Sequence, residues 1–148
     1  MTTMNRIATA FIALLLASSA FAQVAPGKWV NREIPQMTMN VESMGTGFSI
    51  VYEIPTPDGK MVRMTIKTPL DGSETPFLID GKETGQTYAG KRVDARHSAG
   101  VVKMNGKVTG ISKAELSADG KTITVENEIP AAAVGGKASK RVEHWDKR

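Results

Sequence analysis

The stretch FSIVYEIPTPDGKMVRMTIK, residues 48–67, holds two segments of alternating apolar and polar residues on either side of a turn. The apolar side chains occupy every second position: Phe48, Ile50, Tyr52, Ile54, Val62, Met64 and Ile66. Because successive side chains of a strand point to opposite faces, this spacing predicts two strands that each bury one face. Between them, Asp58-Gly59 accepts positive φ and closes tight turns, so we predict an antiparallel hairpin.

The same turn chemistry recurs along the chain. It appears at five dipeptides, Asp58-Gly59, Asp71-Gly72, Asp80-Gly81, Asn105-Gly106 and Asp119-Gly120. Valine, isoleucine and threonine together supply 31 of the residues after position 22, whereas only three leucines remain there. β-Branched residues favour pleated strands over helices, so the composition and the turns together predict a succession of hairpins.

Further alternating segments bring the total to eight to ten short strands. Ile123, Val125 and Ile129 share one face of one strand, and Met37, Met39 and Val41 share a face of another. Weaker candidates span 27–32, 76–79, 86–95, 100–104, 107–116 and 139–145. Closing such a sheet hides its edges, so we predict an all-β fold, an up-and-down antiparallel β-barrel. A two-layer β-sandwich is the alternative, because hairpin rhythm does not show whether the last strand meets the first.

The first 22 residues have the organisation of a secretory signal peptide. A polar head, Met1–Arg6, precedes an apolar run, Ile7–Leu16, and Ala20-Phe21-Ala22 places small residues where signal peptidase cleaves. The apolar run is about half the length that spans a bilayer, so we predict no stable membrane insertion after cleavage. The sequence therefore predicts cleavage between Ala22 and Gln23, a single domain over residues 23–148, and a periplasmic or secreted protein.

Three local matches resemble known barrels. Gly27-Lys28-Trp29 looks like the Gly-x-Trp motif of lipocalins, whose tryptophan lies at the closed end of the barrel. The segments Ser117–Val125, Val142–Lys147 and Lys91–Asp94 are similar to those of a group of small exported bacterial lipocalin-like barrels of unassigned function. The resemblance is clearest from about residue 91 to the end. It implies a lipocalin-like fold and export, and it carries over no catalytic residue.

Few residues suggest catalysis, metal binding or nucleic-acid binding. The chain has no cysteine, and its two histidines, His97 and His144, have no partners at catalytic or zinc-ligand spacing. We predict no catalytic residue, no metal site and no cofactor. The net charge of +4 is scattered without interleaved aromatic residues, so no nucleic-acid partner is predicted. Met37, Met39 and Met44 leave Cu(I) binding by thioethers as a minor alternative.

The preferred functional hypothesis is a non-enzymatic binding module. A closed barrel can hold a small apolar or amphipathic ligand in its interior. We predict Tyr52, Met64, Tyr88 and Arg92 as ligand-binding residues, with Arg92 placed to receive an acid group. The alternative is an envelope interaction protein that contacts an unidentified partner through its outer surface. An enzyme is the third hypothesis. It would require residues far apart in the sequence to come together in the fold, because the sequence itself shows no catalytic cluster.

Overall fold

The computed structural model describes residues 26–45, 47–131 and 135–148. The predicted signal peptide and its cleavage site lie outside the described residues. Within the described part, no helix is long and apolar enough to cross a membrane. The strands follow one another along the chain as β1 (Gly27–Asn31), β2 (Thr38–Met44), β3 (Gly47–Pro55), β4 (Met61–Thr68), β5 (Asp71–Ile79), β6 (Lys82–Arg92), β7 (His97–Met104), β8 (Lys107–Leu116), β9 (Thr122–Ile129) and β10 (Ser139–Lys147).

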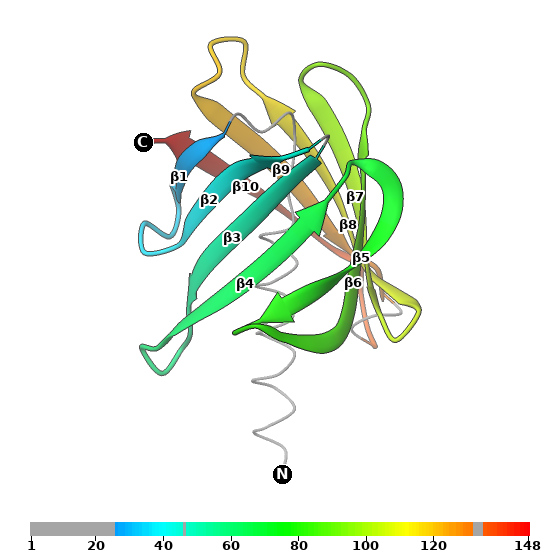
Figure 1. Cartoon of the computed structure of the whole chain (residues 1–148). Helices are drawn as coiled ribbons and strands as arrows, with labels where there is room; N and C mark the ends of the chain where they lie inside the picture. Colours follow the sequence, from blue (N-terminus) through cyan, green and yellow to red (C-terminus); the bar gives the residue numbers. More distant parts are fainter. Residues whose placement is uncertain (1–25, 46, 132–134) are drawn as a thin grey trace.

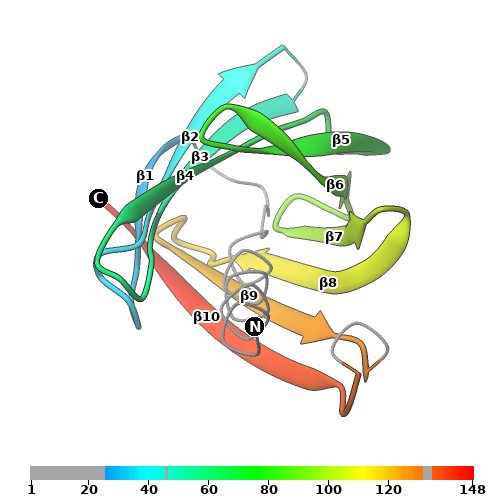
Figure 2. The same cartoon turned by 90° about the horizontal axis from the view of Figure 1, so that it is seen from below.

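The ten strands form a closed up-and-down antiparallel barrel in which each strand pairs with its neighbours in sequence (Figure 1). The first and last strands close it, with Trp29 opposite Lys147 and Asn31 opposite Trp145. Figure 2 shows the strands as a ring when the barrel is viewed along its length. The predicted barrel is therefore confirmed, and the sandwich alternative is excluded by the β1–β10 pairing.

Alternation along the strands separates the inner from the outer wall. Six of the side chains that the sequence places on the inner face are fully buried, namely Ile50, Tyr52, Met64, Ile66, Ile123 and Val125, whereas Phe48, Val62 and Ile129 are partly buried. In the first hairpin Tyr52 lies opposite Met64 and Ile50 opposite Ile66. Their outward neighbours, such as Lys67, face solvent. Burial of these β-branched and aromatic residues on one side holds the hairpin against the rest of the core.

Four of the five predicted turns join strands, and one does not. Asp80 and Asn105 adopt φ of 48° and 50°, each before a glycine at 82°, in two-residue turns. Asp71-Gly72, predicted as a turn, instead begins β5. The chain reverses one step earlier, at Leu70, which takes φ of 56° without being glycine. This prediction was wrong because the Asp-Gly signal does not distinguish a turn from an irregular strand start.

The joint between β4 and β5 is the shortest in the barrel. Only Met64 with Ile79 and Thr65 with Leu78 are paired there. The first half of β5 pairs with β6 instead, beginning with Asp71 opposite Lys91. In Figure 1 the two strands diverge from each other away from this short contact. We call this joint, from Met64–Thr68 to Asp71–Ile79, the β4–β5 seam.

Candidate functional site

One side of the barrel interior is an apolar wall. The buried side chains of β2 to β5 are Met39, Val41, Ile50, Tyr52, Ile54, Met64, Ile66, Thr68 and Phe77. The polar groups of this wall are the hydroxyls of Tyr52 and Thr68, and the Thr68 hydroxyl accepts a hydrogen bond from the N–H of Leu70 at 3.2 Å. The wall therefore presents hydrocarbon, thioether and aromatic surface and no charge.

The other side of the interior carries buried polar groups. Each of the strands β6 to β10 contributes one, and we call the set the polar row: Gln86, Ser98, Ser112, Asn127 and Glu143. Ser112 and Asn127 are opposite each other across β8 and β9. Asn127 lies opposite Arg141, which places it diagonally from Glu143. Polar residues at inward positions of five successive strands are unusual in a core, since each buried polar atom must be satisfied.

Tyr88 lies on a glycine surface beside this row. A Cβ added at Gly90 or Gly100 would overlap its ring, so both glycines give the ring room to lie flat on β6 and β7. The hydroxyl interacts with Ser112, and complete burial raises the Tyr88 pKa well above its usual value of 10. The Phe77 and Tyr88 rings pack in a T-shaped arrangement with centroids 6.2 Å apart. Tyr88 thus joins the apolar wall to the polar row.

Glu143 is the most unusual member of the polar row. Its side chain is fully buried, whereas its neighbours are exposed (Val142) or partly exposed (His144). Glu143 and Trp145 are two positions apart on β10, so both point into the barrel. Neither carboxyl oxygen has a hydrogen-bond partner of normal geometry. The nearest cation is Arg141, with Nε 3.5 Å from Oε1. Burial raises the Glu143 pKa to about 8, although Arg141 and the Trp145 indole act in the opposite direction.

The structure brings three of the four predicted ligand-binding residues into the interior. Tyr52, Met64 and Tyr88 are fully buried, and Tyr52 packs edge-on against Trp145 with ring centroids 5.8 Å apart. Arg92 shares the alternation of Tyr88 but stands at the end of β6, where it is exposed. Sequence reasoning missed Gln86 and Glu143. Their signal was present, because Gln86 alternates with Tyr88 and Glu143 with Trp145.

The methionines that prompted the copper alternative are divided between the core and the surface. Met37 and Met39 are buried, whereas Met44 is 45% exposed. Met39 and Met44 are five residues apart on β2, about 17 Å along an extended strand, and point to opposite faces. These three side chains therefore do not form one ligand set. Among the described residues no group of three or more histidine or acidic side chains could hold a metal ion.

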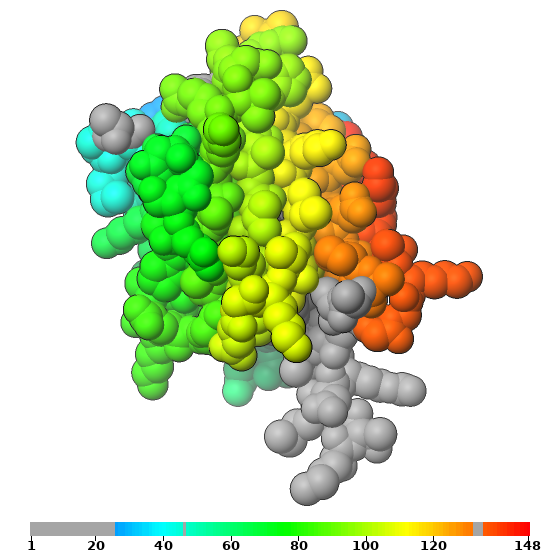
Figure 3. All heavy atoms as spheres, turned by 90° about the vertical axis from the view of Figure 1, so that its right-hand side faces the viewer, coloured from blue at the N-terminus to red at the C-terminus, as the bar shows by residue number. Residues whose placement is uncertain are grey.

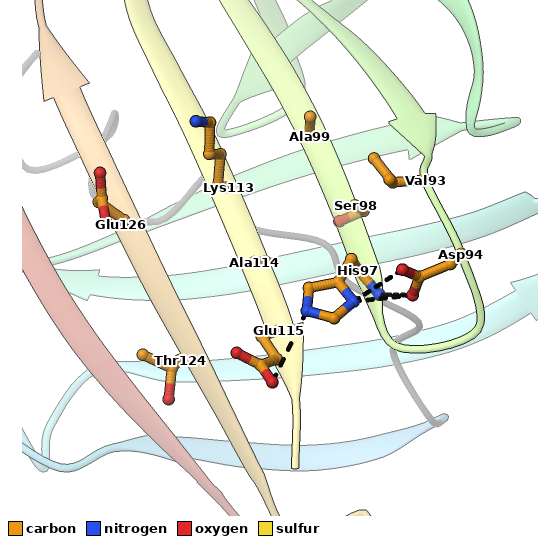
Figure 4. A pocket seen from close by; sticks show the side chains of 10 residues that line it. All are labelled: Val93, Asp94, His97, Ser98, Ala99, Lys113, Ala114, Glu115, Thr124 and Glu126. Carbon is orange, nitrogen blue, oxygen red and sulfur yellow. Dashed lines mark hydrogen bonds and ion pairs between the residues drawn. The ribbon is translucent and has the colours of Figure 1, made fainter. Parts of the chain in front are cut away.

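A depression of about 490 Å³ lies outside the barrel, on the outer wall of β7, β8 and β9. Figure 3 faces the part of the surface where these strands lie side by side. At one end His97 stands between two carboxylates (Figure 4). Its Nδ1 is 2.8 Å from Asp94 and its Nε2 is 3.6 Å from Glu115. The backbone N–H of Arg96 and the His97 ring together lower the Asp94 pKa.

The outer depression and the interior differ in what they offer. The His97 side chain is 41% exposed, so its ion pairs are weakened by solvent, and the apolar side chains of the depression, Val93 and Ala99, lie open on the outer wall. The interior combines an extended apolar wall with buried polar atoms, the usual composition of small-molecule sites. No protein-family model and no curated protein matches the chain.

Proposed function

We propose that the barrel binds an amphipathic small molecule in its interior. The observation that carries this proposal is that the interior combines an apolar wall on β2–β5 with a polar row that lies among apolar side chains on β6–β10. A core that serves stability alone gains nothing from a buried carboxyl group without a hydrogen-bond partner. A ligand that places its polar group at the row and its apolar body on the wall satisfies both surfaces.

The size of the barrel supports this proposal. Barrel diameter grows with strand number, and eight strands already enclose enough space for a small ligand in some folds. This barrel has ten. Tyr52 and Met64 are the residues that we expect against the apolar body, with Tyr88 between wall and row. Arg92 stands at the exposed end of β6, where it can contact a ligand only as the ligand projects from the interior.

Methionine methyl groups provide an internal test of where a ligand binds. We would titrate the protein, labelled with ¹³C at the methionine methyls, with the neutral amphipathic fluorophore 1-aminoanthracene. The buried Met39 and Met64 signals should shift, and those of Met44 and Met61, which are 45% and 48% exposed, should stay in place. Assignment uses single Met→Leu variants, which conserve volume. Shifts confined to Met44 and Met61, or no binding, would reject the interior site.

We also propose that the protein is exported and related to lipocalin-like barrels. The closed antiparallel barrel supports the resemblance in fold, and the organisation of residues 1–22 supports export. N-terminal sequencing of the protein recovered from the periplasm or medium should begin at Gln23. Because Gln23 can cyclise, a blocked terminus requires mass measurement of the intact chain. An intact Met1 on soluble cytoplasmic protein would contradict export.

The outer depression favours a second candidate function, binding of a protein partner on the outer wall. Val93, 64% exposed, and Ala99 form an apolar strip beside the charged His97 group. If a partner binds there, Ala99→Arg should abolish its retention on the immobilised protein by inserting a charged side chain into the depression. The affinity of 1-aminoanthracene should not change. Retention by the variant equal to that by the wild type would argue against this surface.

A further inference from the structure

Among the residues that the structure describes, Glu143 is the one ionisable side chain of Asp, Glu, Lys, Arg or His that is fully buried. It projects from β10 beside Trp145, on the same inner wall as the polar row. Neither of its oxygens accepts a hydrogen bond of normal geometry, and the side chains that interact with the carboxyl group are those of Arg141 and Trp145. A buried polar group in this state destabilises the protein until a partner satisfies it.

The groups around Glu143 determine which partner it can accept. On β10 itself, Arg141 approaches to 3.5 Å, longer than the 2.7–2.9 Å of a charge-assisted hydrogen bond. Beyond β1, Glu33 adds a second negative charge that disfavours ionisation of Glu143. On β9, the residues opposite and diagonal are Val125 and Asn127, neither of which carries charge. This environment favours the uncharged carboxylic acid, in agreement with its raised pKa of about 8.

An uncharged carboxylic acid has an O–H to donate. Gln86, at the other end of the polar row, also has an amide nitrogen, Nε2, without a partner. Glu143 and Gln86 therefore each offer an unused donor, and an acceptor on a ligand is complementary to both. An ammonium group is disfavoured because Arg141 already lies beside Glu143. A carboxylate is disfavoured because Glu33 and any ionised Glu143 would repel it.

We propose that Glu143 binds the polar group of the interior ligand and selects an uncharged hydrogen-bond acceptor, such as a ketone, an ester or a tertiary amide. This inference rests on the proposed interior site. The acceptor takes the Glu143 proton in a hydrogen bond, and the rest of the molecule lies on hydrocarbon and aromatic surface that includes Val125 and Trp145. Selection arises because a ligand without an acceptor leaves the buried carboxyl group unsatisfied.

Three probes with the same ten-carbon chain test the proposal by displacing 1-aminoanthracene at pH 6.5. They are N,N-dimethyldecanamide, decylamine and decanoate, which carry a neutral acceptor, a cation and an anion. The amide should bind best, by on the order of tenfold, the worth of one buried hydrogen bond. Glu143→Leu should remove this preference, whereas Glu143→Gln, which keeps an N–H donor, should retain it. Glu128→Gln, an outward carboxylate on β9, is the matched control and should change nothing.

The pH profile supplies a readout that a merely structural role would not move. Affinity for the amide should fall above about pH 8 as Glu143 loses its proton, and Glu143→Gln should make the profile flat. Tighter binding of decylamine, an unchanged preference in Glu143→Leu, or a flat wild-type profile would each overturn the proposal. If 1-aminoanthracene binds inside and any of these three contrary results occurs, the interior site stands and only the proposed selectivity is refuted. If neither the fluorophore nor the probes bind, the interior site itself is refuted.

Discussion

Replacing Glu143 by glutamine should make the protein more resistant to unfolding at neutral and alkaline pH. The pKa of its carboxyl group is about 8 in the folded protein against 4.5 in a model compound. Because folding raises this pKa, the folded state holds a proton that the unfolded state releases between these two values. The free energy of unfolding contributed by Glu143 is therefore highest below about pH 4.5 and declines as the pH rises to about 8.

The size of this effect follows from the pKa shift. Each pKa unit corresponds to about 1.4 kcal/mol. Between pH 4.5 and 8 the free energy of unfolding of the wild type should therefore fall by up to about 5 kcal/mol because of Glu143, and that of Glu143→Gln should lack this decrease. Other carboxyl groups titrate in both proteins, so the difference between the two free energies isolates Glu143. That difference should grow with pH and level off above about pH 8.

Urea denaturation followed by tryptophan fluorescence measures this difference. Trp29 and Trp145 are both buried, and each should report unfolding as it becomes exposed. Curves are recorded at half-unit steps from pH 4.5 to 9 for the wild type, Glu143→Gln and the outward control Glu128→Gln. The free energy of unfolding of the control should stay within about 0.5 kcal/mol of the wild-type value. A constant difference between Glu143→Gln and the wild type would refute the reasoning, since it would mean that Glu143 ionises without penalty.

Three further changes test other parts of the structure. Gly100→Ala should lower the free energy of unfolding by about 1–3 kcal/mol because its Cβ overlaps the Tyr88 ring, and Tyr88→Leu should recover part of that loss in a double-mutant cycle; independent effects would contradict the packing. Ile66→Ala should lower the free energy of unfolding, measured by urea denaturation, by about 2–4 kcal/mol, and Lys67→Ala should hardly change it. The reverse order would mean that the inner face is misassigned. Arg92→Ala should reduce decanoate affinity about fivefold or less, since an exposed charge is screened; a much larger loss in calorimetry would place Arg92 at the ligand's head group.

The inner face of the barrel could be predicted because burial imposes a period of two. Ile50, Tyr52 and Met64 stand at alternate positions that only a half-buried strand explains. Closure could not be predicted in the same way. A sandwich and a barrel need the same alternation, and they differ in whether Trp29 meets the last strand, a contact between residues more than a hundred positions apart.

The candidate site was harder to predict than the fold. Gln86 and Glu143 resemble ordinary solvent-facing strand residues, because a polar side chain is normally taken as outward. Only the phase of the alternation shows otherwise, since Glu143 has the same parity as Trp145. Arg92 has the inward parity too, but sequence does not show where the barrel wall ends. The turn at Leu70 left no signal, because a leucine with positive φ is held there by its surroundings and not by its own preference.

The β4–β5 seam is the place where the barrel should open lengthwise most readily. Every other pair of neighbouring strands is held by a longer run of paired residues, so a lengthwise split there breaks the fewest main-chain hydrogen bonds. Amide hydrogen exchange should detect this split as a partial opening at lower free energy than global unfolding. The ring would become an open curved sheet in which every other strand pair stays intact, and a molecule held inside would leave sideways through the wall without passing either rim.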